Sequence, residues 1–178
     1  MAAGASATGA RGVAIGADGG NINNPGIGAQ AQGVDSFAAG TDSNALGQNA
    51  MALGRNTIAG GINAATVGVN AQALSNNATA VGANVIVQGN ESTAVGMNSR
   101  VTQARGTSVG FDAQSANFAT AVGSASRATI LRATAVGSTA NASRIDSTAL
   151  GSASVAAFDR STAVGFGATT TRVDQVTL

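Results

Sequence analysis

The sequence predicts an all-β fold, a parallel β-solenoid built from coils of about 14 residues. Three observations predict it. The phrase Thr-Ala-Val-Gly, as in Thr93–Gly96, recurs at a fixed spacing, which is typical of repeat architectures. Small and polar residues alternate after each glycine, which is the pattern of a short strand. Glycine, threonine and valine together in every copy disfavour a helix, and no apolar stripe of period 3.6 is sustained.

The glycines of the phrase mark one position per coil. They are Gly54, Gly68, Gly82, Gly96, Gly110, Gly123, Gly137, Gly151 and Gly165. Neighbouring glycines are 14 residues apart, except that Gly110 and Gly123 are 13 apart. The residue before the glycine is apolar: Val67, Val81, Val95, Val109, Val122, Val136, Leu150 and Val164 among them. We expect each glycine to lie at a turn with positive φ, or where a Cβ would clash.

Each coil is expected to hold two strands. The first ends in the Val-Gly phrase, and the second covers the third to fifth residues after the glycine, where small, polar and small residues follow one another. An extra phrase, Ala45-Leu46-Gly47, lies halfway along its coil. It indicates that a coil has two similar halves, each with one short strand and one turn.

The chain divides into three predicted segments. Residues 1–39 are looser first coils, with a repeat-like Val13-Ala14-Ile15-Gly16 and turn-forming residues at Asp18-Gly19-Gly20 and Asn23-Asn24-Pro25-Gly26. Residues 40–170 hold the regular repeats, and residues 171–178 are a separate segment. Terminal repeats are usually atypical, which fits the looser beginning.

The first strand has no charged face, because Thr and Val occupy one face and Ala and Gly the other. One face packs inside the roll, and the other would form a continuous apolar strip, which marks an interaction site. We therefore predict that first strands pack against copies in other chains. Either face could point inward. Val facing the small residues of the second strand would fill the roll, and that arrangement would leave Ala and Gly toward a neighbouring chain.

The composition argues against catalysis. The chain has no His and no Cys, and its eight Asp and Glu residues do not recur in the repeat. It therefore lacks the usual nucleophiles, general bases and zinc ligands, and we expect no enzymatic activity, metal or cofactor. A net charge of +1 is too small to indicate a nucleic-acid or membrane-surface binder. No run of residues is long and apolar enough for a membrane span, and no signal peptide is visible.

Two sets of polar residues are candidates for contacts. Arginines on predicted outer strands or turns are either solvated charges, the simpler interpretation, or a ligand surface: Arg100, Arg127, Arg132, Arg144 and Arg160. A threonine column is expected to bond to the neighbouring coil or chain. It comprises Thr79, Thr93, Thr107, Thr120, Thr134, Thr148 and Thr162. An ice-binding solenoid is a less favoured interpretation of that column.

The Ser/Thr-Ala-Val-Gly phrase at a 14-residue period, from Met51 to Ala168, resembles the head repeats of trimeric autotransporter adhesins, the YadA-like head family. The resemblance implies a left-handed parallel β-roll from each of three identical chains, assembled as a homotrimer. It also implies export and anchoring in the outer membrane of a Gram-negative bacterium, with the signal peptide and anchor outside these residues. Thr171–Val176 resembles the start of the neck that follows such heads.

The function implied by the resemblance is attachment to host cells or extracellular matrix through a multivalent trimeric surface. The family phrase Ser-Val-Ala-Ile-Gly survives only near Val13–Gly16, so a matrix ligand does not follow directly. The alternative function is a structural spacer rod that presents a distal binding domain.

Overall fold

The computed structural model describes residues 4–19 and 28–178, which fall in two compact units, Met1–Val87 and Gln88–Leu178. Every regular element in the described residues is a β-strand, and every strand pair for which a register is known is parallel. The predicted parallel β-solenoid is therefore confirmed. The predicted turn at Asn23–Gly26 lies outside the described residues, as does Gly20.

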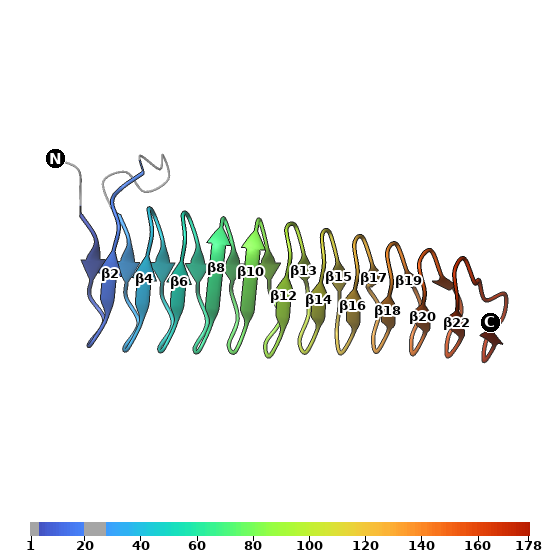
Figure 1. Cartoon of the computed structure of the whole chain (residues 1–178). Helices are drawn as coiled ribbons and strands as arrows, with labels where there is room; N and C mark the ends of the chain where they lie inside the picture. Colours follow the sequence, from blue (N-terminus) through green and yellow to red (C-terminus); the bar gives the residue numbers. More distant parts are fainter. Residues whose placement is uncertain (1–3, 20–27) are drawn as a thin grey trace. The chain divides into compact units, whose positions relative to one another are not determined.

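The first unit winds through two sheets, with successive strands in alternate sheets (Figure 1). One sheet holds β2 (Val13–Ile15), β4 (Phe37–Ala39), β6 (Met51–Leu53), β8 (Ala65–Val69) and β10 (Thr79–Ala83). The other holds β1 (Ser6–Ala7), β3 (Gln30–Ala31), β5 (Asn44–Ala45), β7 (Ile58–Ala59), β9 (Gln72–Ala73) and β11 (Ile86–Val87). Each coil thus contributes one strand to each sheet.

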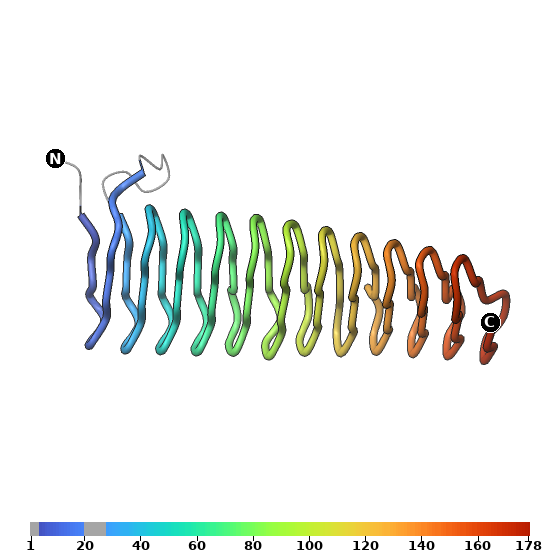
Figure 2. Tube along the Cα trace, viewed as in Figure 1, coloured from blue at the N-terminus to red at the C-terminus, as the bar shows by residue number. Residues whose placement is uncertain are grey.

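The second unit repeats this arrangement, and its trace passes from coil to coil without a helix (Figure 2). One sheet holds β12 (Thr93–Val95), β14 (Thr107–Val109), β16 (Thr120–Val122), β18 (Thr134–Val136), β20 (Thr148–Leu150), β22 (Thr162–Val164) and β23 (Val176–Thr177). The other holds β13 (Arg100–Val101), β15 (Gln114–Ser115), β17 (Arg127–Ala128), β19 (Asn141–Ala142) and β21 (Val155–Ala156).

The register stacks each phrase on its own copy in the next coil. Thr134 pairs with Thr148 and Val136 with Leu150, for example. We call the sheet made of these phrases the first-strand sheet, and the sheet that contains β9 or β19 the second-strand sheet. Residues 171–178 add a turn and β23, which pairs with β22 through Thr162 and Val176.

The two halves of each coil have the same backbone. A residue with φ of 52° to 60° recurs every seven residues from Asp35 to Arg160, apart from one step of six residues between Asp112 and Phe118. It lies in the turn after each strand, so the predicted division into two similar halves is confirmed. The eight such residues from Asp35 to Asn84 are all Asp or Asn, which tolerate this left-handed conformation.

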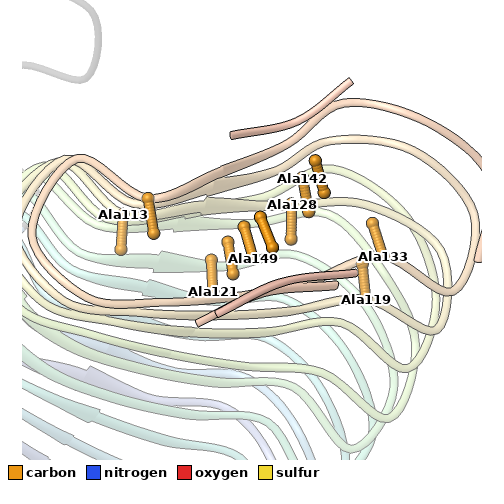
Figure 3. Close-up of a cluster of buried hydrophobic side chains, with 11 residues drawn as sticks. Ala113, Ala119, Ala121, Ala128, Ala133, Ala142 and Ala149 are labelled. Carbon is orange, nitrogen blue, oxygen red and sulfur yellow. The ribbon is translucent and has the colours of Figure 1, made fainter. Parts of the chain in front are cut away.

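The interior of the roll contains only small side chains. In the second unit the residues two before each glycine are fully buried: Ala94, Ser108, Ala121, Ala135, Ala149 and Ala163. They face a row from the second-strand sheet that includes Ala128 and Ala142 (Figure 3). The largest fully buried side chains in the described residues are valines and threonines such as Val101 and Thr57.

The arrangement with the phrase valines inside is therefore wrong. In β18, Ala135 is buried, whereas Thr134 is half-buried and Val136 is 37% exposed on the outer face. Ala135 packs in a closed interior against buried small residues such as Ala128 and Ala142 of the opposite sheet. A larger side chain in its place would overpack this interior and push the two sheets apart. Ala faces inward because it fits, and Thr and Val face outward.

The phrase glycine meets both expectations for it. Gly96 has φ of +118°, and a Cβ on it would lie 2.5 Å from the carbonyl oxygen of Gly110 in the next coil. The glycine therefore allows both the turn and the close stacking of coils.

The 13-residue coil loses its residue from the turn after the second strand. That turn is Ala116–Ala119 after β15, whereas the corresponding turn after β19 is Ser143–Ser147. The flanking strands keep their register, since Thr107 pairs with Thr120 and Gln114 with Arg127. The missing residue thus shortens one edge of the roll and leaves both sheets intact.

Candidate ligand-binding surfaces

A coil presents four surfaces to its surroundings. The first-strand face and the second-strand face are the outer faces of the two sheets. The first-turn edge lies between the phrase glycine and the second strand, and the second-turn edge lies between the second strand and the next first strand. The predicted residues are distributed over these four surfaces.

The first-strand face is uncharged in every described coil. It carries the predicted apolar column, Val67, Val81, Val95, Val109, Val122, Val136, Leu150 and Val164, beside the threonine column. Val109, Val136 and Leu150 are 36–37% exposed. In the part of the chain that the structure describes, the hydroxyls of the threonine column donate no hydrogen bond to a neighbouring coil. This face thus keeps apolar surface and free hydroxyls for contact with another molecule.

The second-strand face changes from coil to coil. In the first unit it carries Ile58, Gln72 and Ile86 from β7, β9 and β11. In the second unit it carries Arg100, Gln114, Arg127, Asn141 and Val155. Arg100 and Arg127 are exposed, and the Arg127 Nη2 lies 4.0 Å from the Asp112 Oδ2, at the limit of an ion pair. This face therefore offers a different pattern of side chains at each step.

Both turn edges of the first unit carry asparagine ladders. On the second-turn edge, the Asn49 amide donates to Asn63 and the Asn63 amide to Asn77, each at 3.0 Å. On the first-turn edge, the Asn56 amide donates to Asn70 at 2.9 Å, and the Asn70 amide donates at 3.0 Å to the next asparagine of the ladder. These ladders join successive coils through uncharged hydrogen bonds.

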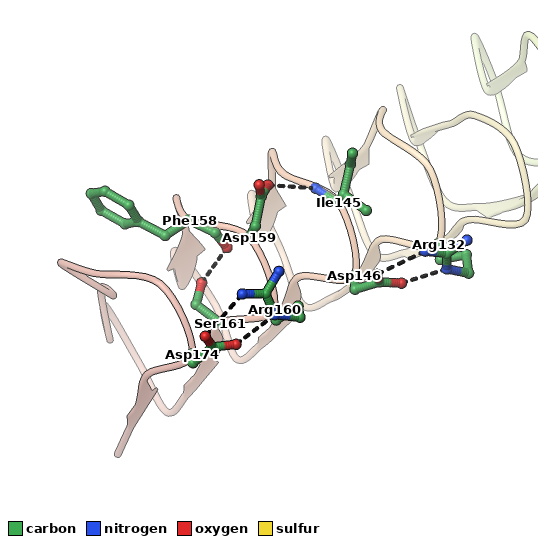
Figure 4. Close-up of polar contacts among 8 residues, drawn as sticks. All are labelled: Arg132, Ile145, Asp146, Phe158, Asp159, Arg160, Ser161 and Asp174. Carbon is green, nitrogen blue, oxygen red and sulfur yellow. Dashed lines mark hydrogen bonds and ion pairs between the residues drawn. The ribbon is translucent and has the colours of Figure 1, made fainter.

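Ion pairs replace the asparagines on the second-turn edge of the second unit (Figure 4). The Arg132 guanidinium donates to both Asp146 carboxylate oxygens at 2.5 and 2.8 Å, and Arg160 donates to both of Asp174 at 2.6 and 2.9 Å. Arg105 donates to Glu91 at 2.7 Å. Each pair joins residues 14 apart in the left-handed position of neighbouring coils. From Arg132 to Asp174 the charges at this position alternate from coil to coil.

These pairs shift the pKa values of their members. The hydrogen bond from Arg132 lowers the pKa of Asp146, and burial acts in the opposite direction. The hydrogen bond from Arg160 lowers the pKa of Asp174 in the same way. The arginine partners have raised pKa values for the same reason. Because all four side chains are on the surface, each pair stabilises the fold only modestly.

The five predicted arginines do not form one site. Arg100 and Arg127 lie on the second-strand face, whereas Arg132, Arg144 and Arg160 lie on the second-turn edge. Arg132 and Arg160 are engaged in ion pairs, but the Arg144 Nη1 donates only to the carbonyl of Ser143, at 3.2 Å. Ligand contact by these residues stays a prediction.

Sequence reasoning missed the large apolar residues of the second-turn edge. Ile130, Ile145, Phe158 and Val173 are 36–45% exposed there. Each lies seven or eight residues after a phrase glycine, where the sequence otherwise has turn residues. The signal was a large apolar residue at a turn position in four successive coils.

The described residues contain no group of three or more Asp or Glu side chains that could hold a metal ion. Among them, no helix has the length and apolar character needed to cross a membrane.

Comparison with known proteins identifies the repeat. The family model for the YadA head domain repeat matches residues 31–57, 59–84, 131–154 and 142–168, just over half of the chain. The chain belongs to the YadA head repeat family. It is thus a YadA-like head domain of a trimeric autotransporter adhesin, with the stacked coils and uncharged first-strand face described above.

Solved structures similar to this YadA-like head include the crystal structure of the collagen-binding domain of the Yersinia adhesin YadA, at 26% sequence identity, with 84% of this chain and 69% of that chain covered and a TM-score of 0.46. No curated protein sequence matches the chain. Proteins of the YadA-like family are surface adhesins anchored in the outer membrane.

Proposed function

We propose that this head attaches a Gram-negative bacterium to host cells or extracellular matrix as a homotrimer. The observation that carries the proposal is the contrast between the two outer faces. The first-strand face is uncharged in every described coil, whereas the second-strand face and the second-turn edge vary from coil to coil. A constant face suits contact between identical chains, and variable faces suit a ligand.

The seam between chains is the Thr–Val column of the first-strand face. Its valines are half-exposed, its threonine hydroxyls are available as donors, and it bears no charge that three identical chains would bring together. Repeating one weak contact over many coils gives a stable assembly without any single strong site.

Light scattering tests the seam with a matched pair of variants. Val136→Glu places a carboxylate on the first-strand face, and Asn141→Glu places one on the second-strand face of the same coil. We expect Val136→Glu to dissociate the trimer, because burying an unpaired charge is costly, and Asn141→Glu to leave it intact. A stable monomer of the unmodified chain at micromolar concentration would refute the trimer.

Binding to immobilised matrix proteins and to cultured host cells tests attachment. Collagen is the first ligand to measure, since the similar Yersinia domain is described as collagen-binding. The control is an unrelated β-solenoid of equal length. Binding above this control supports an adhesive head, and its absence from all matrix proteins and cells would identify a spacer rod that presents a distal domain.

Such a head acts at the bacterial surface. We place it there with an outer-membrane anchor supplied elsewhere in the full-length protein, as in other YadA-like adhesins. Detection of the folded head on intact bacteria with an antibody, and its loss after surface proteolysis, would test this location.

A further inference from the structure

Three side chains on the second-turn edge of the second unit share one position in successive coils. Arg144, Phe158 and Arg172 each follow the phrase glycine of their coil by seven residues. The Arg160 amide donates to the Ile145 carbonyl at 3.0 Å, and the Asp174 amide to the Asp159 carbonyl at 3.2 Å, so these turns stack directly. Coils separated by the ordinary strand spacing place the two arginines about 10 Å apart, with the phenylalanine between them.

All three side chains are exposed. Phe158 is 36% exposed, and its ring points away from the Arg160–Asp174 pair (Figure 4). An aromatic ring that is rigid and partly open to solvent offers a flat face for stacking.

The two arginines keep their charges available. The nearby carboxylates accept hydrogen bonds from other groups. Asp146 accepts from Arg132 and Asp174 from Arg160, while Asp159 accepts from the Ile145 amide at 3.2 Å. In the described part of the chain, neither Arg144 nor Arg172 forms an ion pair with a carboxylate. Their guanidinium groups therefore have donors left for an anionic ligand.

We propose that Arg144, Phe158 and Arg172 bind a linear anionic polysaccharide. A sugar ring stacks on Phe158, and sulfate or carboxylate groups on either side of it accept hydrogen bonds from the two guanidinium groups. The planar guanidinium group suits such bidentate anions. The inference deepens the proposed attachment function, since it names a class of host ligand and the residues that bind it.

The spacing of the arginines disfavours an acidic peptide. An extended chain places side chains on one face every second residue, at about 7 or 13 Å, which does not match about 10 Å. A polyproline-type chain repeats at about 9 Å, but such chains are bound in grooves lined by several aromatic rings. Phe118, the other ring on this edge, lies three coils away and is covered by the Arg105 guanidinium, 5.2 Å from its centroid. Phe158 therefore stands alone between the two arginines, which suits a single sugar ring better.

Binding of the unmodified trimer to immobilised heparin and hyaluronan tests the proposal, with neutral dextran and poly-L-glutamate as comparison polymers. Heparin and hyaluronan distinguish sulfate from carboxylate groups. We expect Arg144→Gln with Arg172→Gln to weaken binding to at least one of them by tenfold or more, and Phe158→Ala to weaken it severalfold. The matched control, Arg11→Gln with Arg55→Gln, removes the same charge from exposed turns of the first unit and should change affinity less than about twofold.

Four outcomes would overturn the proposal. They are no binding to either anionic polysaccharide, equal weakening by the control pair, tighter binding to poly-L-glutamate, and a changed oligomeric state of the Arg144→Gln, Arg172→Gln variant in light scattering. Attachment to matrix proteins or cells that persists without polysaccharide binding would refute this inference and leave the proposed function standing. Loss of attachment to every host surface would refute the function itself.

Discussion

At the scale of single residues, the backbone of the roll depends on two kinds of turn position. The phrase glycine combines a φ that other residues rarely adopt with close contact to the next coil. The left-handed residue of each half-coil reverses the chain after every strand, and in the second unit it includes Thr139 and Ala153 as well as Arg132 and Asp146. The residues other than aspartate tolerate this conformation less well and store strain of about 1 kcal/mol or more each.

Replacing the phrase glycine separates its two roles. Gly96→Ala adds a Cβ 2.5 Å from the Gly110 carbonyl oxygen, whereas Gly165→Ala at nearly the same φ meets nothing within 4 Å. We expect Gly165→Ala to lose about 1–3 kcal/mol of unfolding free energy from backbone strain alone, and Gly96→Ala to lose more. Urea denaturation of both variants measures this difference. Equal losses would show that the close contact between coils costs nothing.

Residue-scale reasoning predicted the role of the phrase glycine but not which face of the first strand points into the roll. Both faces of the Thr-Ala-Val phrase are uncharged, so hydrophobicity could not choose between them. Side-chain size could have done so, because the positions two before each glycine stay small in every coil, as at Ala94, Ser108 and Ala121. An interior that accepts only small residues is recognised by its uniform size.

At the scale of elements, neighbouring coils are joined by side-chain ladders on their turn edges. The first unit uses amide ladders such as Asn49–Asn63–Asn77, and the second uses ion pairs such as Arg132–Asp146. The partners of both kinds of ladder are 14 residues apart, so each ladder is visible in the sequence once its position is known. The spacing of the glycines alone did not show which turn residues stack on one another.

Removing one ladder amide measures what the ladder contributes. Asn63→Gly keeps a residue that tolerates φ of 55° but removes the bonds with Asn49 and Asn77. We expect a loss of about 1–2 kcal/mol in the free energy of unfolding. Thermal and urea denaturation would measure it, and Asn63→Ala should lose more because alanine adds backbone strain. A variant as stable as the unmodified chain would show that the exposed ladder is incidental.

Because of these ion pairs, we expect the stability of the fold to depend on pH. Arg132 lowers the pKa of Asp146 in the folded chain, so the stabilisation is complete above the ordinary aspartate pKa of about 4 and is lost as pH falls through the lowered value. Asp146→Asn removes the charge but keeps a residue that tolerates the turn. We expect its Tm to lie below that of the unmodified chain at neutral pH and to converge with it in acid. A constant difference from pH 7 to pH 2 would contradict the proposed cause.

At the scale of the whole molecule, each coil contacts mainly its neighbours, so whole coils are exchangeable. Deleting residues 138–151 joins Gly137 to Ser152 and keeps every column in place. We expect this variant to fold and to form the same trimer. Deleting only residues 138–144 keeps the small inward residues inward, because the half-coils are alike, but moves all later Thr–Val phrases to the other sheet. This variant should keep its strands and lose the trimer, as circular dichroism and light scattering would show.

The sequence predicted the coil and its two halves because the same short pattern returns in nearly every turn. It did not predict which exposed arginines are available to a ligand. Arg132 and Arg144 are both predicted turn arginines, and only their neighbours in the adjacent coils show that Asp146 pairs with the first and no carboxylate in the described residues pairs with the second. Availability depends on contacts between coils, which a single copy of the repeat does not contain.

The small interior has an evolutionary consequence. Since residues such as Ala121, Ala135 and Ala149 are already nearly the smallest available, mutation can do little there except enlarge them, and selection will hold those columns fixed. The outward positions of the second-strand face carry no such constraint, because a new side chain there disturbs neither sheet. Substitutions can therefore accumulate on that face one coil at a time, while the two sheets stay the same.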